Sequence, residues 1–509
     1  MKNQLYYRIR ISAAILLMAG ASLLATGDLQ AQSTAPARPA STTATSQPPA
    51  PPVTGDPTGP LSLQQCVELA LANNLELKQA EIQASSAKVD YKQSRNNLLP
   101  AVNGFVEHGL NQGRSIDPFS NSYLNQNINY ANYGLSGGVV LFNGLAAQYN
   151  IKSQRLAYEA GQADIQQNKD NLIVQVMVAY LQVLATSDQL VQIRNQAELS
   201  RKQVERLTLL NNEGSITPSQ LFDLKGQLAN DEISLINTQN QLEAARLTLC
   251  QLMNVPYDPT IQPQSISTGD FLKSYEGSAA TVYQSALQNL AMVKSATLKK
   301  ESAEQGVKAW KSQLWPVFSV NAGLYTNYSS AAKTARLISS SEVETGGYIK
   351  INGSQSPVYT MQDNFTQQDI SYGNQFRNNY STNVNLAVRI PILNSLQTRN
   401  RISRSKLVLQ NADVVEKTTR TRLQQQVEQA WLNMTATYNR YNTLLQQVDA
   451  FNESFRGTEA RFNEGVLNSV DYLTAKNNLD RANNNLIIAR YEYVLRTRIL
   501  DYYQGMPVW

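Results

Sequence analysis

The sequence has very little of what most catalytic and metal sites are built from. Its 509 residues include one histidine, His108, and two cysteines, Cys66 and Cys250. A Ser-His-Asp triad or a His-based metal site therefore has almost no candidate residues, and the cysteines show no CxxC spacing. Neither a phosphate-binding loop nor a metalloprotease motif is present. We therefore expect no enzyme activity, no metal and no cofactor. The sequence leaves open whether the two cysteines form a disulfide.

Charged residues are also scarce. They make up 16% of the chain, the formal net charge is +5, and Asn, Gln, Ser and Thr supply much of the polarity. No dense Lys/Arg run with interleaved aromatic residues is present, so nucleic acid is not an expected partner. A composition that is polar but weakly charged suits surfaces that face water on two sides.

The N-terminus indicates export from the cytoplasm. Lys2, Arg8 and Arg10 precede an apolar run over 11–25, and a stretch of small residues ends near Ala31. This is the plan of a secretory signal, predicted over residues 1–31. The apolar run is shorter than the roughly 20 residues that a membrane-spanning helix needs. The segment that follows, 32–60, is rich in Pro, Thr and Ala and is predicted to be a disordered tether.

The rest of the chain is an internal repeat. Pro316 repeats Pro100 at an offset of 216 residues, and Asn394 repeats Asn143 at an offset of 251, so the second copy carries an insertion of 35 residues. The predicted repeats are 61–279 and 280–509, each with a helix, a strand pair and a long helical hairpin. The first helix of each repeat, over 63–97 and 280–313, is expected to end before the proline, because the residue before a proline avoids the helical region.

The strands have two unlike faces. Val384, Leu386 and Val388 alternate with Asn383 and Asn385, and Phe318 to Leu324 follows the same period of two. The first-half strands, near 101–110 and 131–142, are richer in glycine. An aromatic girdle of the kind found in membrane barrels is predicted near the strand ends, from Tyr130, Tyr133, Phe142, Tyr325, Tyr328 and Tyr380. Residues 329–380 are predicted to be a long polar outer loop.

The period then changes to that of long helices. Apolar and small residues recur every seventh position through 146–212, which at 1.5 Å per residue is about 100 Å long. The matching series in the second half includes Phe451, Phe455 and Phe462, which we expect in the core. Glycine turns at 214 and 465 lead into returning helices over 218–253 and 469–504.

Four amphiphilic strands cannot close a barrel alone, since single-chain barrels begin at about eight strands and an open edge is not tolerated in lipid. The predicted fold class is therefore an α+β membrane protein with an internally duplicated protomer. Three copies would form a 12-stranded β-barrel continued by a long α-helical coiled-coil barrel.

Several motifs resemble the TolC-type outer membrane efflux proteins, in family order over 61–509: Gly113-Arg114-Ser115-Ile116-Asp117-Pro118, Asn125-Gln126-Asn127, Asn132-Tyr133-Gly134-Leu135, Leu141-Phe142-Asn143-Gly144, Asn212-Glu213-Gly214, Asn463-Glu464-Gly465 and Tyr502-Tyr503-Gln504-Gly505. The resemblance implies a homotrimer in the cell outer membrane with its helical barrel in the periplasm. It also implies a periplasmic adaptor protein and an inner-membrane pump, of the RND or ABC type. The chain would be the passive exit duct of a tripartite efflux or type I secretion system.

The resemblance places the functional residues at the two turns. Gly214, Ser215, Gly465 and Val466 would form the periplasmic tips where the adaptor docks. The candidates for an entrance gate are Asp471, which would form a threefold acidic ring, and Gln220, Leu467 and Arg461. An arginine that often closes the gate in the family is replaced here by Leu467. Thr217 to Gln220 and Asn468 to Asp471 also fit helix-capping boxes.

The strand–helix junctions are predicted at Pro100, Pro316, Asn143, Gly144 and Asn394.

Two other functions fit part of the sequence. A structural coiled-coil envelope scaffold would need neither two-faced strands nor a signal, and a general diffusion porin would need no glycine-tipped helices about 100 Å long.

Overall fold

The computed structural model describes residues 60–116, 121–125, 127–266 and 274–506. The predicted signal over 1–31, and the predicted tether apart from Pro60, lie outside these residues, as do Asp117, Pro118 and Gln126 of the motifs above. The elements in chain order are α2 (Leu63–Asn73), α3 (Leu75–Asn96), β1 (Ala101–Asn111), β2 (Arg114–Ile116), β3 (Tyr123–Asn125), β4 (Ile128–Phe142), α4 (Ala146–Asn212), α5 (Pro218–Met253), α6 (Ala279–Asn289), α7 (Ala291–Ser312), β5 (Val317–Ser329), β6 (Lys333–Ile351), β7 (Ser354–Asp369), α8 (Tyr372–Asn378), β8 (Ser381–Arg389), α9 (Gln397–Asn463) and α10 (Ser469–Gln504).

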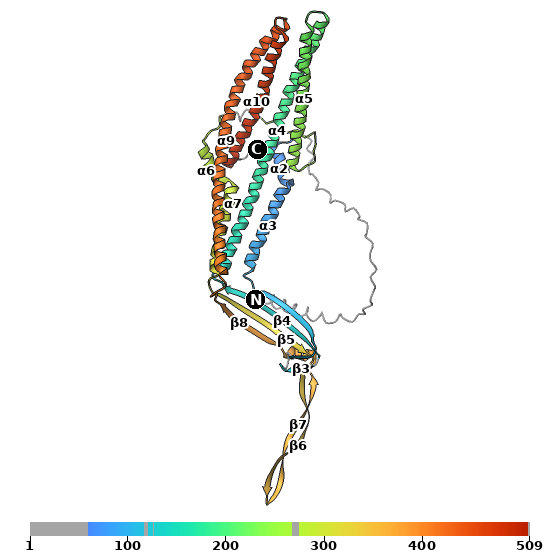
Figure 1. Ribbon diagram of the computed structural model, residues 1–509, viewed down its shortest axis with the longest axis vertical. Coiled ribbons are helices and arrows are strands. Elements are labelled where there is room, and N and C mark those ends of the chain that lie inside the picture. The colour runs from blue at the N-terminus through green and yellow to red at the C-terminus, as the bar shows by residue number, and fades with distance from the viewer. Residues whose placement is uncertain (1–59, 117–120, 126, 267–273, 507–509) are drawn as a thin grey trace, which may run out of the picture. The chain divides into compact units, whose positions relative to one another are not determined.

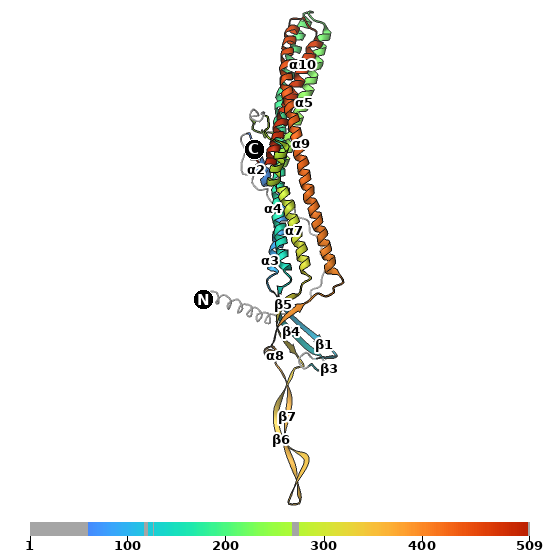
Figure 2. The same cartoon turned by 90° about the vertical axis from the view of Figure 1, so that its left-hand side faces the viewer.

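The long helices come in matched pairs, one in each half of the chain. Helices α2 and α6 have 11 residues each, α3 and α7 have 22, α4 and α9 have 67, and α5 and α10 have 36. Figure 1 shows α4 beside α5 and α9 beside α10 as two hairpins, and Figure 2 shows the long helices after a quarter turn. The predicted internal duplication is confirmed, and so are the predicted bounds of α4, α5 and α10.

The prediction of one continuous helix before each proline, over 63–97 and 280–313, is wrong. Each helix is broken once, at Asn74 and at Leu290. Asn74 has ψ 123°, and its side-chain oxygen accepts the N–H of Leu77 at 2.8 Å. An asparagine that caps a new helix in this way competes with continuation of the old one. Leu290 has ψ 130° and makes the same break without a side-chain cap.

Strands β1, β4, β5 and β8 form one antiparallel sheet in that order. The register gives it an apolar face and a polar face. The apolar face carries Val102, Val106, Leu135, Val139, Val320, Leu324, Val384, Leu386 and Val388, and the polar face carries Asn103, Ser136, Asn321, Asn383 and Asn385. Among the described strands, β1 pairs only with β4, and β8 only with β5. The two-faced strands are confirmed, in a sheet whose outer edges are both unpaired.

Three aromatic rings of the polar face each cover a glycine: Phe105 covers Gly134, Tyr325 covers Gly323 and Tyr130 covers Gly109. A Cβ atom on any of these glycines would lie 2.1 to 2.5 Å from the ring. The girdle prediction is therefore wrong for Tyr130 and Tyr325, which lie on the polar face. The absent Cβ atoms let the rings pack against the backbone of the sheet.

The prediction of a polar loop over 329–380 is also wrong. Strands β6 and β7 pair with each other and with no other described strand, so they form a separate two-stranded ribbon. Helix α8 follows, and its buried Gln375 accepts the N–H of Ser329 at 2.9 Å and donates to the carbonyls of Ser329 and Ile370. The strand pattern is hard to see in the sequence because many of the alternating residues are Ser, Thr, Gln and Asn.

The cores of the helical part follow the predicted heptads. Buried heptad residues are Leu172, Val176, Ala179, Val183, Leu190, Ala197 and Leu207 on α4, and Leu423, Val427, Met434, Tyr441, Leu444, Phe455 and Phe462 on α9. Cys66 and Cys250 lie buried in the cluster formed by α2, α4 and α5, and both thiols are free. Burial raises the pKa of Cys66 to about 12, and the neighbouring Cys250 adds to the rise.

Candidate functional site: the hairpin tips

The first hairpin reverses at Gly214, between α4 and α5. Gly214 has φ +72°, and its N–H donates to the carbonyl of Asn211 at 3.0 Å. The N–H of Ser215 donates to the carbonyl of Leu210 at 2.9 Å. These two bonds are the Schellman motif, whose left-handed residue favours glycine because a Cβ atom would strain it. Gly214 and Ser215 are exposed, so they form the outer surface of the turn.

The second hairpin reverses in the same way at Gly465. This residue has φ +75° and donates to the carbonyl of Phe462 at 3.0 Å, while Val466 donates to the carbonyl of Arg461 at 2.9 Å. Val466 is 66% exposed, which is unusual for an apolar residue at a turn. The side chain of Arg461 is exposed and makes no ion pair with any residue that the structure describes.

The helices that leave the two turns are capped differently. Thr217 is the N-cap of α5 and Pro218 takes the first helical position, but the Thr217 side chain makes no capping bond. The predicted capping box with Gln220 is therefore wrong, and only the Thr217 carbonyl accepts the Gln220 N–H. At α10 the Asn468 side chain accepts the N–H of Asp471 at 2.9 Å, which is one of the two bonds of the predicted capping box. The exposed carboxylate of Asp471 thus lies at a helix N-terminus, where negative charge is stabilised.

A small apolar core, here called the tip cluster, joins the two hairpins behind the turns. It consists of Leu207, Leu221, Leu224, Phe455, Phe462 and Tyr472. The rings of Phe462 and Tyr472 stack with centroids 4.5 Å apart. Leu467 is partly buried against this cluster. The structure therefore places Leu467 in the packing between the hairpins, while Asp471 and Arg461 are exposed.

A buried polar cluster lies further along the same helices. The Lys476 side chain of α10 is 1% exposed, and its ammonium group lies 3.0 Å from the Asp231 carboxylate of α5 and 2.7 Å from that of Asp480. Ser200 of α4 and Gln227 also donate to Asp231. Burial raises the pKa of Asp480, although the Lys476 charge acts in the opposite direction. Asp231 thus connects α10, through Lys476, and α4, through Ser200, to α5.

Two further polar contacts link the hairpins next to the turns. Arg206 of α4 donates to the side chain and the backbone carbonyl of Asn463, the last residue of α9. Ser469 donates to the carboxylate of Asp223 at 2.8 Å. Sequence reasoning missed these residues and Lys476, because the partners are more than 240 positions apart and each looks like an ordinary helix surface residue.

The predicted junction residues lie where strands meet helices. The Asn143 side chain accepts an N–H of the first turn of α4 at 3.3 Å, and the Asn394 side chain donates to a threonine hydroxyl of the first turn of α9 at 2.6 Å. Gly144 has φ +68°, and a Cβ there would lie 2.5 Å from the carbonyl oxygen of the last residue of α7. Pro100 and Pro316 immediately precede β1 and β5.

The polar face of the sheet lines a hollow of about 860 Å³. Asn103, Ser136, Asn321, Asn385 and Arg389 contribute to its wall. Polar and apolar side chains of all four strands line the hollow, and no His, Cys, Asp or Glu is among them, so it does not resemble a small-molecule site with converging catalytic groups.

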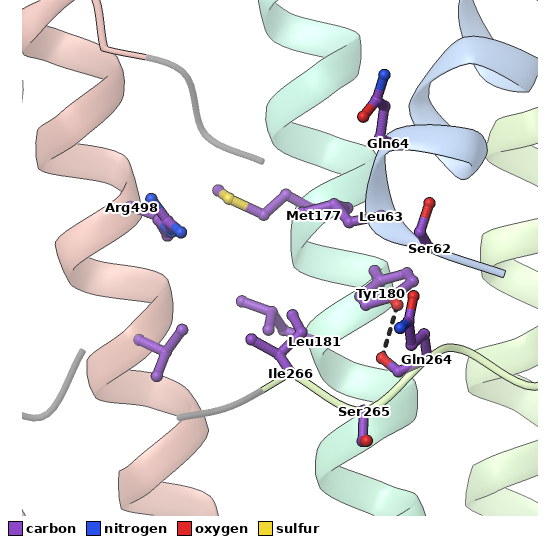
Figure 3. Close-up of a pocket in the computed structure, with 11 residues that line it drawn as sticks. Ser62, Leu63, Gln64, Met177, Tyr180, Leu181, Gln264, Ser265, Ile266 and Arg498 are labelled. Atoms are coloured by element: carbon purple, nitrogen blue, oxygen red, sulfur yellow. Dashed lines mark hydrogen bonds between the residues drawn. The ribbon is translucent and has the colours of Figure 1, made fainter. Parts of the chain in front are cut away.

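A smaller pocket of about 350 Å³ lies among α2, α4, α10 and residues 264–266, as Figure 3 shows. The Tyr180 hydroxyl donates to the carbonyl of Gln264 at 2.8 Å and lies 3.0 Å from that of Leu61. Its lining includes Met177, Leu181 and Ile266, and Arg498 approaches from α10. Since Tyr180 bonds only to backbone carbonyls here, we assign these contacts to fixing the segment before α2 onto the helices.

Among the residues that the structure describes, no group of His, Cys, Asp and Glu side chains is suited to hold a metal ion. In the same residues, no helix combines the length and the apolarity needed to cross a membrane.

Solved structures share this fold over most of their length. The chain superimposes on the structure of CusC with a TM-score of 0.72 at 15% identity, covering 87% of this chain and 92% of that one. For VceC from Vibrio cholerae the TM-score is 0.70 at 14% identity, covering 88% of this chain and 97% of that one. For the CmeC outer membrane channel of Campylobacter jejuni the TM-score is 0.69 at 14% identity, covering 87% of this chain and 85% of that one. These similarities establish the fold.

Sequence comparison adds the family. The outer membrane protein TolC of Vibrio cholerae serotype O1 is 21% identical over 438 residues, which cover 85% of this chain and 88% of that protein. The family model described as outer membrane efflux protein matches residues 66–255 and 282–501, one segment in each half and together most of the chain. The chain therefore belongs to the outer membrane efflux protein family, and it is an efflux channel of the outer membrane and not an enzyme.

Proposed function

We propose that three copies of the chain close into a passive duct, with a 12-stranded barrel in the outer membrane and a helical tunnel in the periplasm. The observation that carries this proposal is the four-stranded sheet, which is apolar on one face, polar on the other and unpaired at both edges. Hydrocarbon cannot satisfy open edges, and four strands are too few to close on themselves. Pairing β8 of one copy with β1 of the next removes every open edge.

The outer helices support the same closure. Helix α3 packs on α4 and α9 packs on α7, so α3 and α9 lie at opposite ends of the row α3, α4, α7, α9. Both carry exposed apolar residues at intervals of seven: Leu75, Ile82 and Val89 on α3 are 62 to 70% exposed, and Leu407 and Val414 on α9 are 64 and 59% exposed. Such heptad stripes are typical of helices that pack against another helix. In a ring of three copies, α9 would meet α3 of the next copy.

The tips are the part of the molecule best suited to dock a periplasmic adaptor. Gly214, Ser215, Gly465 and Val466 are exposed on turns whose backbone is fixed by the Schellman bonds. The adaptor would connect the duct to an inner-membrane pump of the RND or ABC type, which supplies the energy for transport. The domain division remains part of this proposal, with a signal over 1–31, a tether over 32–60 and repeats over 61–279 and 280–509.

The entrance is proposed to carry a threefold ring of Asp471 carboxylates, with Gln220, Leu467 and Arg461 close by. The exposure of Asp471 at the start of α10 supports this role, because three such side chains around one axis would attract cations. Leu467 contributes packing, through its contact with the tip cluster.

The oligomeric state tests the central proposal. The mass of the detergent-solubilised protein should be that of three chains, and the purified protein should conduct ions in a planar bilayer. A monomer that conducts, or a trimer that never inserts into lipid, would overturn the proposal.

The docking role is tested by a photo-crosslinking amino acid at Val466, in cells that express the complete efflux system. The same probe at Val191, which is 55% exposed on α4, is the control. We expect crosslinks to a periplasmic adaptor at 466 and none at 191. Equal labelling at both positions would discard the tip as the docking surface.

The acidic ring is tested by Asp471→Asn in single-channel recordings. The variant should lose preference for cations over anions and sensitivity to block by divalent cations. Asp449→Asn, an exposed carboxylate about four turns before the end of α9, is the matched control and should leave both unchanged. Unaltered selectivity in the Asp471 variant would remove the ring from the proposal.

A further inference from the structure

A groove of about 730 Å³ lies between α7 and α9, close to the strands. This volume is within the range typical of small-molecule sites in proteins. Arg401 is the fifth residue of α9 and Trp310 the third from the end of α7, so both lie within about two turns of the strand ends of their helices. The set that matters here, called the junction groove, is Lys299, Ser302, Gly306, Trp310, Arg401 and Arg404.

The junction groove is hollow at Gly306, which has no side chain to fill it. A Cβ atom there would have the Ser153 hydroxyl oxygen, at 4.0 Å, as its only neighbour within that distance. Ser153 of α4 and Ser302 of α7 contact each other through their hydroxyl groups at 3.1 Å, so the wall between the two helices is also made of small side chains. Glycine is unfavourable inside a helix relative to alanine. Here its effect is to leave room for a bound group.

The two arginines of the groove have unused hydrogen-bond donors. The guanidinium carbon of Arg401 lies 5.3 Å from the centre of the Trp310 ring. Stacking on an aromatic ring orients a guanidinium group and leaves its N–H groups available in the plane. Neither Arg401 nor Arg404 forms an ion pair or a side-chain hydrogen bond with any residue that the structure describes.

The charge of the groove is positive and largely uncompensated. Lys299 is neutralised locally, because its ammonium group lies 2.8 Å from the Asp164 carboxylate. No Asp or Glu lines the groove, and α9 carries four basic residues before its first acidic residue, Asp413. The two arginines therefore leave two positive charges beside an empty space that is large enough for a small molecule.

We propose that the junction groove binds an anionic amphiphile, a molecule with one acidic head group on an apolar body. A carboxylate, sulfonate or phosphate would accept hydrogen bonds from Arg401 and Arg404, because the planar donors of guanidinium match such anions. The apolar body would lie against Trp310 and Val408, which both line the groove. Two sources supply this chemistry: a lipid of the surrounding membrane, and a solute that passes through the proposed duct.

The site is complete within one chain. All the residues that line the groove belong to α4, α7 and α9 of the same copy. Leu407 and Val414, through which α9 would meet the next copy, are not among them. Binding to the groove is therefore independent of the proposed trimer, and only the assignment of a transported solute rests on the proposed function.

Calorimetric titration with phenyl phosphate tests the site. This water-soluble probe carries a phosphate on an aromatic ring, and benzyl alcohol is its uncharged counterpart. We expect one phenyl phosphate per chain with a Kd in the millimolar range or below, and no saturable binding of benzyl alcohol. Arg401→Gln should weaken binding by about tenfold, because it removes hydrogen bonds to a charged group. Arg422→Gln removes the same charge from an exposed position on α9, about 30 Å away, and should leave binding unchanged.

A second variant tests the shape of the groove without changing its charge. Gly306→Leu places a side chain in the hollow and should abolish binding of phenyl phosphate. Gly226→Leu is the matched control, since Gly226 is an exposed glycine of α5 whose added Cβ would also meet no close neighbour. The melting temperature and the mass of each variant establish that it is folded and assembled like the unmodified protein.

The lipid composition of the bilayer identifies the source of the natural amphiphile. The titration is repeated in phosphatidylcholine nanodiscs with and without phosphatidylglycerol, an anionic lipid. Weaker binding of phenyl phosphate when phosphatidylglycerol is present would support the site and name membrane lipid as its occupant. Equal binding in both would support the site and name a solute from the aqueous side.

Three results would contradict the inference. The first is no binding of phenyl phosphate in the millimolar range, or equal binding of benzyl alcohol. The second is equal weakening by Arg401→Gln and Arg422→Gln, which would indicate diffuse attraction to the positive charge of α9. The third is unchanged binding in Gly306→Leu, which would mean that the hollow is not used. The mass and the conductance of the unmodified protein test the proposed duct separately, so failure of one proposal is distinguishable from failure of the other.

Discussion

Replacing Lys476 by methionine should loosen the two hairpins from each other more than any other single change of a charged residue near the tips. Methionine keeps most of the length and the apolar part of the side chain but removes the ammonium group. That group lies within 3.0 Å of the Asp231 and Asp480 carboxylates and is 1% exposed. The variant therefore leaves two buried carboxylates without their cation.

The expected cost follows from burial. Removing one partner of a buried ion pair costs about 3 to 5 kcal/mol, because the remaining charge stays desolvated. Ser200 and Gln227 still donate to Asp231, which favours the lower end of that range. At about 1.4 kcal/mol per factor of ten, local opening of α10 from α5 should become roughly a hundredfold or more frequent at neutral pH.

The pH dependence has a definite sign. Burial already raises the pKa of Asp480, with Lys476 acting against the rise, so removing Lys476 raises that pKa further. A carboxyl whose pKa is higher in the folded than in the unfolded chain contributes stability below the unfolded value of about 3.9 and loses it as the pH rises through the folded pKa. The deficit of the variant relative to the unmodified protein should therefore be smaller at pH 5 than at pH 8.

Hydrogen exchange of α5 and α10 measures both effects. Lys202→Met is the control, since Lys202 is 70% exposed and 3.9 Å from its partner Glu198, a surface pair worth well under about 1 kcal/mol. The reasoning is refuted if the Lys476 variant exchanges no faster than the Lys202 variant, or if its deficit is larger at pH 5 than at pH 8.

Three other outcomes are expected. Gly134→Ala should displace the Phe105 ring and destabilise the assembled channel by about 1 to 3 kcal/mol in thermal unfolding. Gly104→Ala should not destabilise it, because the added Cβ would have no neighbour within 3.8 Å. Adding Phe105→Ala to the Gly134 variant should reverse its destabilisation. Neither natural thiol should react with a thiol reagent at pH 8 in the folded protein, and both should react after unfolding, because both are buried away from the reagent and burial raises the pKa of Cys66. Arg206→Met should increase protease cleavage at the second tip, and Arg461→Met, which removes no ion pair within the described chain, should not.

The long-range architecture could be predicted because it depends on periodic patterns. The heptads of α4 and α9 and the alternation of β5 and β8 each repeat often enough to specify helix or strand and the buried face. The turns at Gly214 and Gly465 could also be predicted from the sequence, because a Schellman motif favours a residue that tolerates positive φ.

The failures arose where a single local interaction decides the structure. The breaks at Asn74 and Leu290 interrupt otherwise continuous helical patterns. A side-chain hydrogen bond of Asn74 favours the first break, and no side-chain cap accompanies the second. The sequence predicts a loop for the ribbon because many residues of both strands are Ser, Thr, Gln and Asn, several of which turns also favour.

The connections between the hairpins could not be predicted for a different reason. Lys476 meets Asp231, and Arg206 meets Asn463, only because two helices from different repeats come together with a particular rotation about their axes. A single sequence contains no record of that rotation.

The equal lengths of the paired helices constrain how the duct can change in evolution. Deleting seven residues from α4 alone would shorten that helix by about 10 Å. The hairpin tip at Gly214 would then lie behind the tip at Gly465, and Phe462 and Tyr472 would contact different residues of the first hairpin. A longer or shorter tunnel therefore requires the same edit in α4, α5, α9 and α10 together. Reach across the periplasm is a property that this chain can alter only in four coordinated steps.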